Sequence, residues 1–195
     1  MKLFFRALCC AVIISCLFSL TGFCTACGDI EDKVFRLHIL ANSDSTEDQA
    51  LKLKVRDTVT EYAEELFADC KDKADAMHIA EKNIDKIRTA AENTLKQNGS
   101  NAPVTVSITK MSFDTRVYED FTLPAGKYDA LRIVIGEGKG HNWWCVLYPA
   151  VCVPSAQSDI GSVLSDKENE IVSDSDRYRF GFKFVELFQD FLSLF

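Results

Sequence analysis

The chain has 195 residues, of which 22 are Lys or Arg and 29 are Asp or Glu, so its net charge is −7. This acidic composition argues against binding to nucleic acid or to anionic lipid, because both attract clustered cations. With 47% apolar residues the chain can build one domain with a real core, and disorder is expected only in local tails.

The first residues are typical of an export segment. Lys2 and Arg6 precede a stretch from Ala7 to Cys24 that carries no charge, which is the order of a secretory signal. Small residues suited to a cleavage region follow at Thr21, Gly22, Thr25 and Ala26. The stretch is also as long as a short membrane helix. Residues 1–26 are therefore expected to be a signal peptide or a membrane anchor, and Cys24 to Cys27 weakly resembles a lipoprotein processing site.

The next segment begins a domain that we place at residues 33–153. Phe35, Leu37 and Ile39 alternate with polar residues, which predicts a strand over residues 34–41. Ser45 and Asp48 have the spacing of a capping box and predict the start of a helix that ends near residue 68.

A second amphipathic helix is predicted from Met77 to Leu95, followed by strands near residues 103–111, 117–123, 128–135 and 143–147. The turn residues 124–127 predict a hairpin between the two strands that they separate. The order β-α-α-β-β-β-β predicts an α+β fold, with two amphipathic helices packed on one face of a mainly antiparallel sheet.

Two further segments follow this domain. Residues 154–176 are rich in serine and acidic residues and predict a solvated linker. Residues 177–195 form a Phe-rich amphipathic segment, with Phe184, Phe188, Phe191 and Phe195 on one predicted helical face. Its acidic polar residues favour packing on protein over lipid.

The cysteines outside the export segment allow one internal disulfide. Cys145 and Cys152 lie close in the sequence and could form a bridge in an oxidising compartment, or they could be two buried thiols. We expect no cofactor and no metal ion, because the Gly136–Gly140 loop lacks a phosphate-binding ending and no set of metal ligands has suitable spacing.

Catalysis and binding remain alternatives at the residue level. His38 with Ser43 and Asp44 could form the catalytic group of an exported hydrolase. The adjacent Trp143 and Trp144 begin a strand, where successive side chains point to opposite faces. Either one indole fills the core and the other lies at the surface as a binding anchor, or both rings are buried. A structural protein of the cell envelope is a third alternative.

Several segments of the chain resemble the stage II sporulation protein R family of endospore-forming Firmicutes. The matching stretches are residues 35–45 (FRLHILANSDS), 48–57 (DQALKLKVRD), 123–128 (LPAGKY) and 142–149 (NWWCVLYP). Together they extend over most of residues 34–153.

The resemblance implies a signal rather than an enzyme. Members of this family are thought to be secreted from the forespore into the space between the two membranes of a sporulating cell. There they trigger a membrane-embedded aspartic protease of the mother cell, which cleaves the inactive precursor of sigma-E. On this reading the partner is that protease, there is no nucleic acid partner, and the N-terminal segment alone contacts the membrane.

The candidate partner-binding residues are those of the matched segments that packing explains least. We expect Arg36 and His38 on an exposed strand face, and we expect some of the charged residues to pair internally, with Asp57 or Asp44 beside Arg36 or Arg56. The full set is Arg36, His38, Asn42, Ser43, Asp44, Arg56, Asp57, Asn142, Trp143 and Trp144.

Overall fold

The computed structural model describes residues 2–118, 121–149, 160–174 and 177–192. The elements are, in chain order, α1 (Lys2–Lys33), β1 (Phe35–Leu40), α2 (Thr46–Phe67), α3 (Lys73–Lys82), α4 (Ile84–Gln97), β2 (Val104–Phe113), β3 (Arg116–Val117), β4 (Thr122–Leu123), β5 (Gly126–Ile135), β6 (Asn142–Tyr148), the short 3-10 helix η1 (Ile160–Ser162), α5 (Asp166–Ser173) and α6 (Arg179–Leu192).

These elements form two compact units. The terminal unit comprises Met1–Glu31, Phe113–Gly126 and Ser165–Phe195, and the sheet unit comprises Asp32–Ser112 and Lys127–Leu164. The sheet unit contains all ten candidate partner-binding residues.

The sheet unit confirms the predicted α+β class. Its four-stranded, mainly antiparallel sheet has the order β2-β5-β1-β6. Strand β1 pairs antiparallel with β6 and parallel with β5. A parallel pair needs a long crossover connection, and here the chain between β1 and β5 includes α2, α3 and α4.

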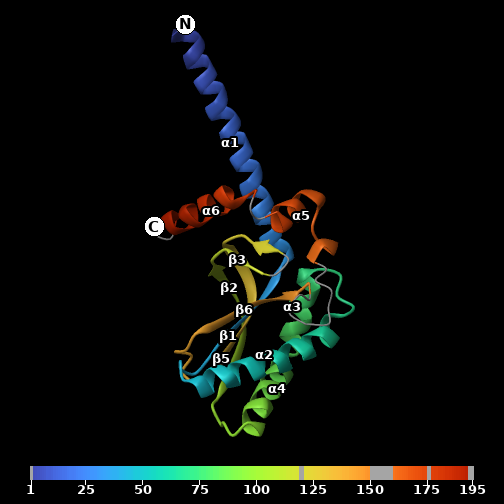
Figure 1. The fold of residues 1–195 in the computed structure, drawn as a ribbon. Helices are drawn as coiled ribbons and strands as arrows, with labels where there is room; N and C mark the ends of the chain where they lie inside the picture. The colour runs from blue at the N-terminus through green and yellow to red at the C-terminus, as the bar shows by residue number, and fades with distance from the viewer. Residues whose placement is uncertain (1, 119–120, 150–159, 175–176, 193–195) are drawn as a thin grey trace. The chain divides into compact units, whose positions relative to one another are not determined.

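The core lies between the sheet and these helices. Phe35, Leu37 and Ile39 of β1 are fully buried and belong to one apolar cluster with residues from all three helices. Helix α2 packs along α4 in this layer (Figure 1). The helical members of the cluster recur at the three- and four-residue spacing of one helix face; among them are Leu51, Val55, Val59, Ala76, Ala80, Ile87, Ala91 and Leu95.

The second predicted helix is in fact two helices, so three helices rather than two cover the sheet. The interruption lies at Asn83, whose side-chain Nδ2 donates to the Ile79 carbonyl at 2.8 Å. The backbone N–H of Asn83 donates to Ala80, and the Asn83 carbonyl accepts from Ile87 at the start of α4. A side chain that binds nearby backbone groups competes with the regular helical ladder. The apolar periodicity continues across the break and gave no sign of it.

The predicted hairpin around residues 124–127 is wrong. Leu123 pairs with Arg116 in the separate two-stranded β3-β4 sheet, whereas β5 pairs with β1. Alternation of apolar and polar residues predicts a strand but does not specify its partner.

The acidic Ser-rich stretch contains regular structure. Helix α5 begins at a capping box in which Ser165 and Glu168 bind each other's backbone N–H groups. Glu168, Ile171 and Val172 are buried. The expectation of a solvated linker is therefore wrong for residues 166–173, because a good cap and two buried apolar side chains offset the polar composition.

Candidate functional site

Two parts of the chain that are distant in the sequence meet at one end of the sheet unit. One is the end of β1 with the loop 41–45 and the start of α2, and the other is the loop between β5 and β6 with the first residues of β6. The antiparallel pairing of β1 and β6 places Leu40 opposite Asn142 and His38 opposite Trp144. We call the side chains of Asp44, Arg56, His141, Asn142, Trp143 and Trp144 the Trp surface.

The loop after β1 is held by the first turn of α2. Ser43 Oγ donates to an Asp48 carboxylate oxygen at 2.5 Å, and Asn42 Nδ2 donates to the same oxygen at 2.9 Å. Ser45 is the N-cap, and its Oγ accepts from the Asp48 backbone N–H at 3.1 Å. The hydrogen bonds from Ser43 and Asn42 lower the pKa of Asp48. The predicted helix start is confirmed, but the Asp48 carboxylate binds the loop instead of closing a capping box.

The same loop binds the connection between β5 and β6. Asn42 Oδ1 accepts from the Glu137 N–H at 3.0 Å, and Asp44 Oδ1 accepts from the His141 N–H at 2.6 Å. The Asp44 carboxylate also contacts His141 Nδ1, and these bonds from His141 lower the pKa of Asp44. Of the two carboxylates predicted as alternative partners of an arginine, Asp44 contacts His141 instead.

The close approach of the β5-β6 connection to the loop 41–45 depends on glycine at position 140. A Cβ at position 140 would lie 2.2 Å from the Ser43 carbonyl oxygen, closer than real Cβ atoms come to backbone. The Gly140 N–H donates to Ala41 at 3.0 Å. At the Gly-rich loop the backbone therefore comes close to the loop 41–45. Glycine permits such a close approach, so these glycines were the one feature of the sequence that could have indicated the contact.

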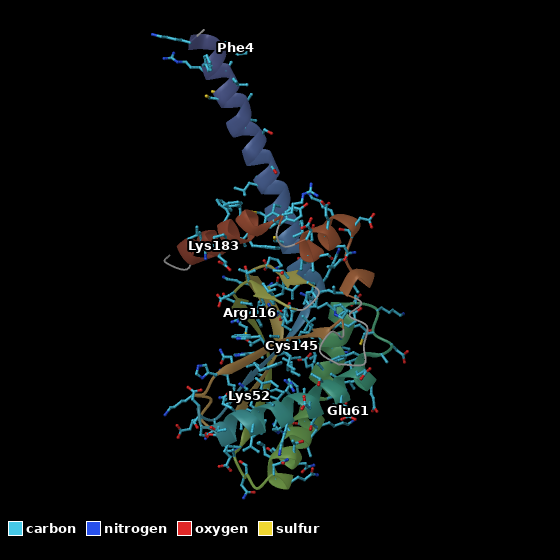
Figure 2. The ribbon with its side chains drawn as sticks, in the orientation of Figure 1. Phe4, Lys52, Glu61, Arg116, Cys145 and Lys183 are labelled. Carbon is cyan, nitrogen blue, oxygen red and sulfur yellow. The ribbon has the colours of Figure 1, made fainter. Side chains whose placement is uncertain are left out.

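Trp143 lies on the helix side of β6. The Arg56 guanidinium of α2 sits 4.4 Å from the Trp143 ring centroid, a cation–π arrangement, and Arg56 also pairs with Asp57 at 2.5 Å. Lys52, labelled on α2 in Figure 2, donates to the His141 carbonyl at 3.0 Å. Burial lowers the pKa of Lys52. The predicted pairing of Asp57 with Arg56 is confirmed.

Trp144 lies on the opposite side of β6 and stacks on His38. Their ring centroids are 4.0 Å apart and their planes differ by 5°. Both indoles are partly exposed and lie on opposite faces of β6, as the strand pattern predicted. Trp143 packs against the apolar core cluster, whereas the Trp144 ring packs on His38.

His38 is buried, with 3% of its surface exposed. Neither ring nitrogen makes a hydrogen bond of normal geometry. Burial lowers the pKa of His38 to about 4; the charge of Arg132 acts in the same direction, and the Asn142 side chain acts against it. At neutral pH the ring is therefore an uncharged partner for Trp144.

Arg36 is fully buried, and its guanidinium lies 5.1 Å from the Tyr128 ring centroid on the neighbouring strand β5. The expectation that Arg36 and His38 lie on an exposed strand face is wrong for both. Their polar character suggested solvent, but a face of a strand can be polar and still be covered.

Residues 31–158 match the model of the stage II sporulation protein R family. The chain belongs to this family. The match covers every residue of the Trp surface and ends before α5 and α6.

A curated member of the family is similar over a large part of this chain. It is the stage II sporulation protein R of Bacillus subtilis (strain 168), which is 39% identical over 123 residues. The aligned region is 63% of this chain and 55% of the relative, so the chain spans about half the length of the curated relative that it matches. No solved structure matches the chain.

The contacts of this sporulation protein R family member do not assemble the imagined hydrolase group. Ser43 Oγ donates to Asp48, and the Asp44 carboxylate binds His141. The His38 ring stacks on Trp144. Each of the three side chains therefore has a different neighbour from the one that a Ser-His-Asp triad requires.

Only one cysteine of the predicted disulfide belongs to the described residues. Cys145 is buried in β6, and Cys152 lies outside the described residues. The disulfide between them stays a prediction.

The described ranges contain neither a metal-binding cluster nor a membrane-spanning helix. Among these residues, no group of three or more His, Cys, Asp and Glu side chains is arranged to hold a metal ion. Within the same part of the chain, none of the helices is long and apolar enough to cross a membrane.

Proposed function

We propose that this protein is an intercellular signal of sporulation, exported from the forespore into the intermembrane space, where it activates the membrane-embedded aspartic protease of the mother cell that processes the sigma-E precursor. On this proposal the protein is not itself an enzyme, and its only membrane contact is through the N-terminal segment. Family membership supports a role in sporulation. The uncharged segment from Ala7 to Cys24 supports export.

The observation that carries the proposal is the convergence of the matched segments on the Trp surface. Two partly exposed indoles next to exposed polar side chains have the composition of a protein-binding patch. His141 and Asn142 are exposed beside them. The hydrogen bonds that Asn42 and Asp44 accept from the β5-β6 connection hold this patch in one geometry, so little ordering is needed on binding.

The candidate residues have different roles in this proposal. Asn142, Trp143 and Trp144 contact the protease directly. Asn42, Ser43 and Asp44 position the β5-β6 connection, and Arg56, Asp57 and His38 hold the indoles in place. Arg36 supports the sheet beneath them.

The test is to express the full chain together with the protease and its sigma precursor in a non-sporulating host and to measure precursor cleavage. We expect cleavage with the wild-type chain and a loss of at least about tenfold in Asn142→Arg and Trp144→Ala, because the patch centre carries most of the binding energy. Lys139→Ala is the matched control, since Lys139 is 76% exposed in the same connection but outside the Trp surface.

Each variant is also secreted alone and checked by circular dichroism, so that unfolding is not mistaken for lost binding. Unchanged cleavage in both surface variants would refute the assignment of the Trp surface. Absence of cleavage with a secreted, folded wild-type chain would refute the signalling function itself.

A further inference from the structure

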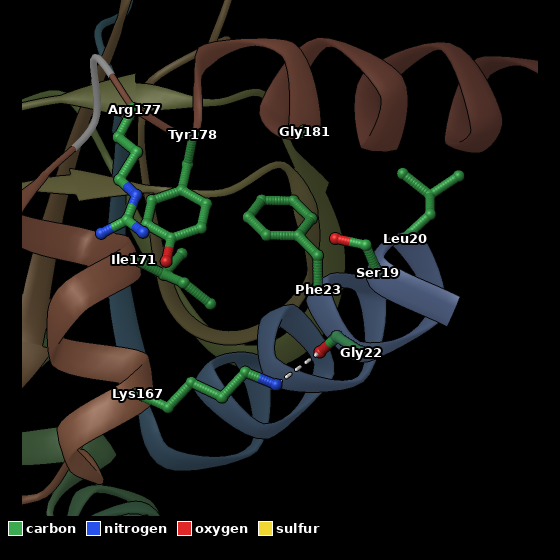
Figure 3. Close-up of a pocket in the computed structure, with 9 residues that line it drawn as sticks. All are labelled: Ser19, Leu20, Gly22, Phe23, Lys167, Ile171, Arg177, Tyr178 and Gly181. Atoms are coloured by element: carbon green, nitrogen blue, oxygen red, sulfur yellow. Dashed lines mark hydrogen bonds between the residues drawn. The ribbon is translucent and has the colours of Figure 1, made fainter. Parts of the chain in front are cut away.

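The last turns of the export segment pack into the terminal unit. Phe23 of α1 is buried, and its ring lies between two aromatic residues at the start of α6. It stacks on Tyr178 with ring centroids 5.7 Å apart and an angle of 15°, and it meets Phe182 edge-on at 5.6 Å. Figure 3 shows the Phe23 and Tyr178 rings facing each other across the pocket, below Gly181. Both distances are within the range of favourable aromatic pairs.

Gly181 lies directly against the Phe23 ring. A Cβ at position 181 would lie 2.8 Å from the Phe23 ring, so any larger residue there would force the buried ring or α6 to shift. Glycine lowers helix stability inside α6. The packing against Phe23 is a physical reason for its presence there.

The buried face of α1 continues beyond Phe23. Ala26, Cys27 and Ile30 are also buried, at the three- and four-residue spacing of one helical face. Burial raises the pKa of Cys27 to about 12, so its thiol stays protonated. This stretch has the side-chain pattern of a core helix.

The predicted cleavage region lies inside this helix. Thr21 to Ala26 are helical, and Thr25 Oγ1 donates to the Thr21 carbonyl at 3.0 Å. A cut after Ala26 would remove Phe23. Tyr178, Phe182 and Gly181 would then lose the aromatic ring that packs against them.

We propose that the exported protein keeps Phe23, and that the last turns of its N-terminal segment are the permanent docking site of α6. Residues 1–26 are then not a disposable signal peptide, because their C-terminal part belongs to the folded protein. This goes beyond the proposed signalling function and does not depend on the protease.

The first test is the mass of the exported chain. The full chain with a C-terminal tag is expressed in a Gram-positive host, recovered from outside the cytoplasm and measured intact. A mature N-terminus at any position that retains Phe23 is the expected result. A chain that begins after Phe23 would overturn the proposal.

The second test enlarges the side chain at Gly181 and shortens the one at Phe23, first separately and then together. Gly181→Leu should push α6 off α1 and raise the rate of tryptic cleavage after the exposed Lys183 by about tenfold, since cleavage follows the population of the opened state. Phe23→Ala should also raise the rate. The double variant should return it to within about twofold of wild type, because the leucine side chain then occupies the space of the removed ring.

The matched control is Gly28→Leu. A Cβ at Gly28 meets no atom within 4 Å, so this variant reports the effect of glycine removal on a helix without a clash. Equal cleavage rates in wild type, Gly181→Leu and the double variant would overturn the docking role. Neither measurement involves the sigma precursor, so a failure here is distinct from a failure of the proposed function.

Discussion

The two faces of strand β1 are equally buried but chemically different. Phe35, Leu37 and Ile39 face the helices and belong to the apolar core. Arg36 and His38 face the other way, and they too are covered, at 0% and 3% exposure. The comparison teaches that alternation identifies a strand and its two faces, but it does not tell which face meets water.

The contributions of the two faces to stability should depend differently on pH. The apolar face gains stability from burial, which hardly depends on pH. The polar face contains a histidine that is stable there only without its proton.

Truncation of the apolar face should have the largest effect. Leu37→Ala removes a fully buried side chain from the core and is expected to lower the free energy of unfolding by about 3 kcal/mol. Urea denaturation of the full chain measures it. Leu53→Ala, the same change at a residue that is 37% exposed on α2, should cost clearly less. Equal losses at the two positions would contradict the assignment of the core face.

Acid should destabilise the polar face. The pKa of His38 is lowered from 6.5 to about 4 in the folded chain, so the unfolded chain binds more protons between these values. Stability is therefore expected to fall as the pH drops from 7 toward 4, by at most about 3 kcal/mol from this residue. Urea denaturation at several pH values measures the slope.

His38→Phe keeps an aromatic ring beside Trp144 and removes the titration. It should flatten the part of the pH dependence between pH 4.5 and 6.5, whereas His78→Phe, at an exposed position, should leave it unchanged. An unchanged slope in His38→Phe would show that other groups cause the acid sensitivity.

The cap of α2 should have a moderate effect. Ser45→Ala removes the acceptor for the Asp48 N–H and is expected to lower stability by about 1 kcal/mol. Ser45→Asp, which keeps an acceptor at the N-cap, should recover most of the loss. If both variants lose the same amount, the cap does not stabilise the helix that covers the apolar face.

The contact of Arg56 with Trp143 should have the smallest effect. A double-mutant cycle of Arg56→Ala and Trp143→Leu is expected to give a coupling free energy of about 0.5–1 kcal/mol. Arg88→Ala combined with Trp143→Leu is the control, because Arg88 pairs with Asp85 on another helix. Its coupling should be near zero.

Local features of the sequence were sufficient for much of the fold. The alternation around Leu37 indicated β1, Ser45 indicated the start of α2, and the grouping of helices before strands indicated the α+β class. These signals act between residues a few positions apart, where side-chain spacing and capping decide the backbone conformation.

Only some of the contacts that build the candidate site could be predicted from the sequence. The adjacent indoles of Trp143 and Trp144 were visible in the sequence, and resemblance to the family added Asn142 to the candidates. The bond between Asp44 and His141 joins residues 97 positions apart and has no local signature. The division of one predicted helix at Asn83 was missed because its cause is a polar side chain and not a change in apolar spacing.

Local sequence patterns identified most of the strands, the start of α2 and the family of this protein, because these depend on nearby residues and on recognisable motifs. The strand predicted over residues 117–123 is instead two short strands, β3 and β4, which pair with each other. The tertiary structure alone decided that Arg36 and His38 are buried, that Asp44 holds the β5-β6 connection, and that Phe23 fits against Gly181. Each of these depends on which distant segment covers a side chain, and that is settled by close packing of the whole unit.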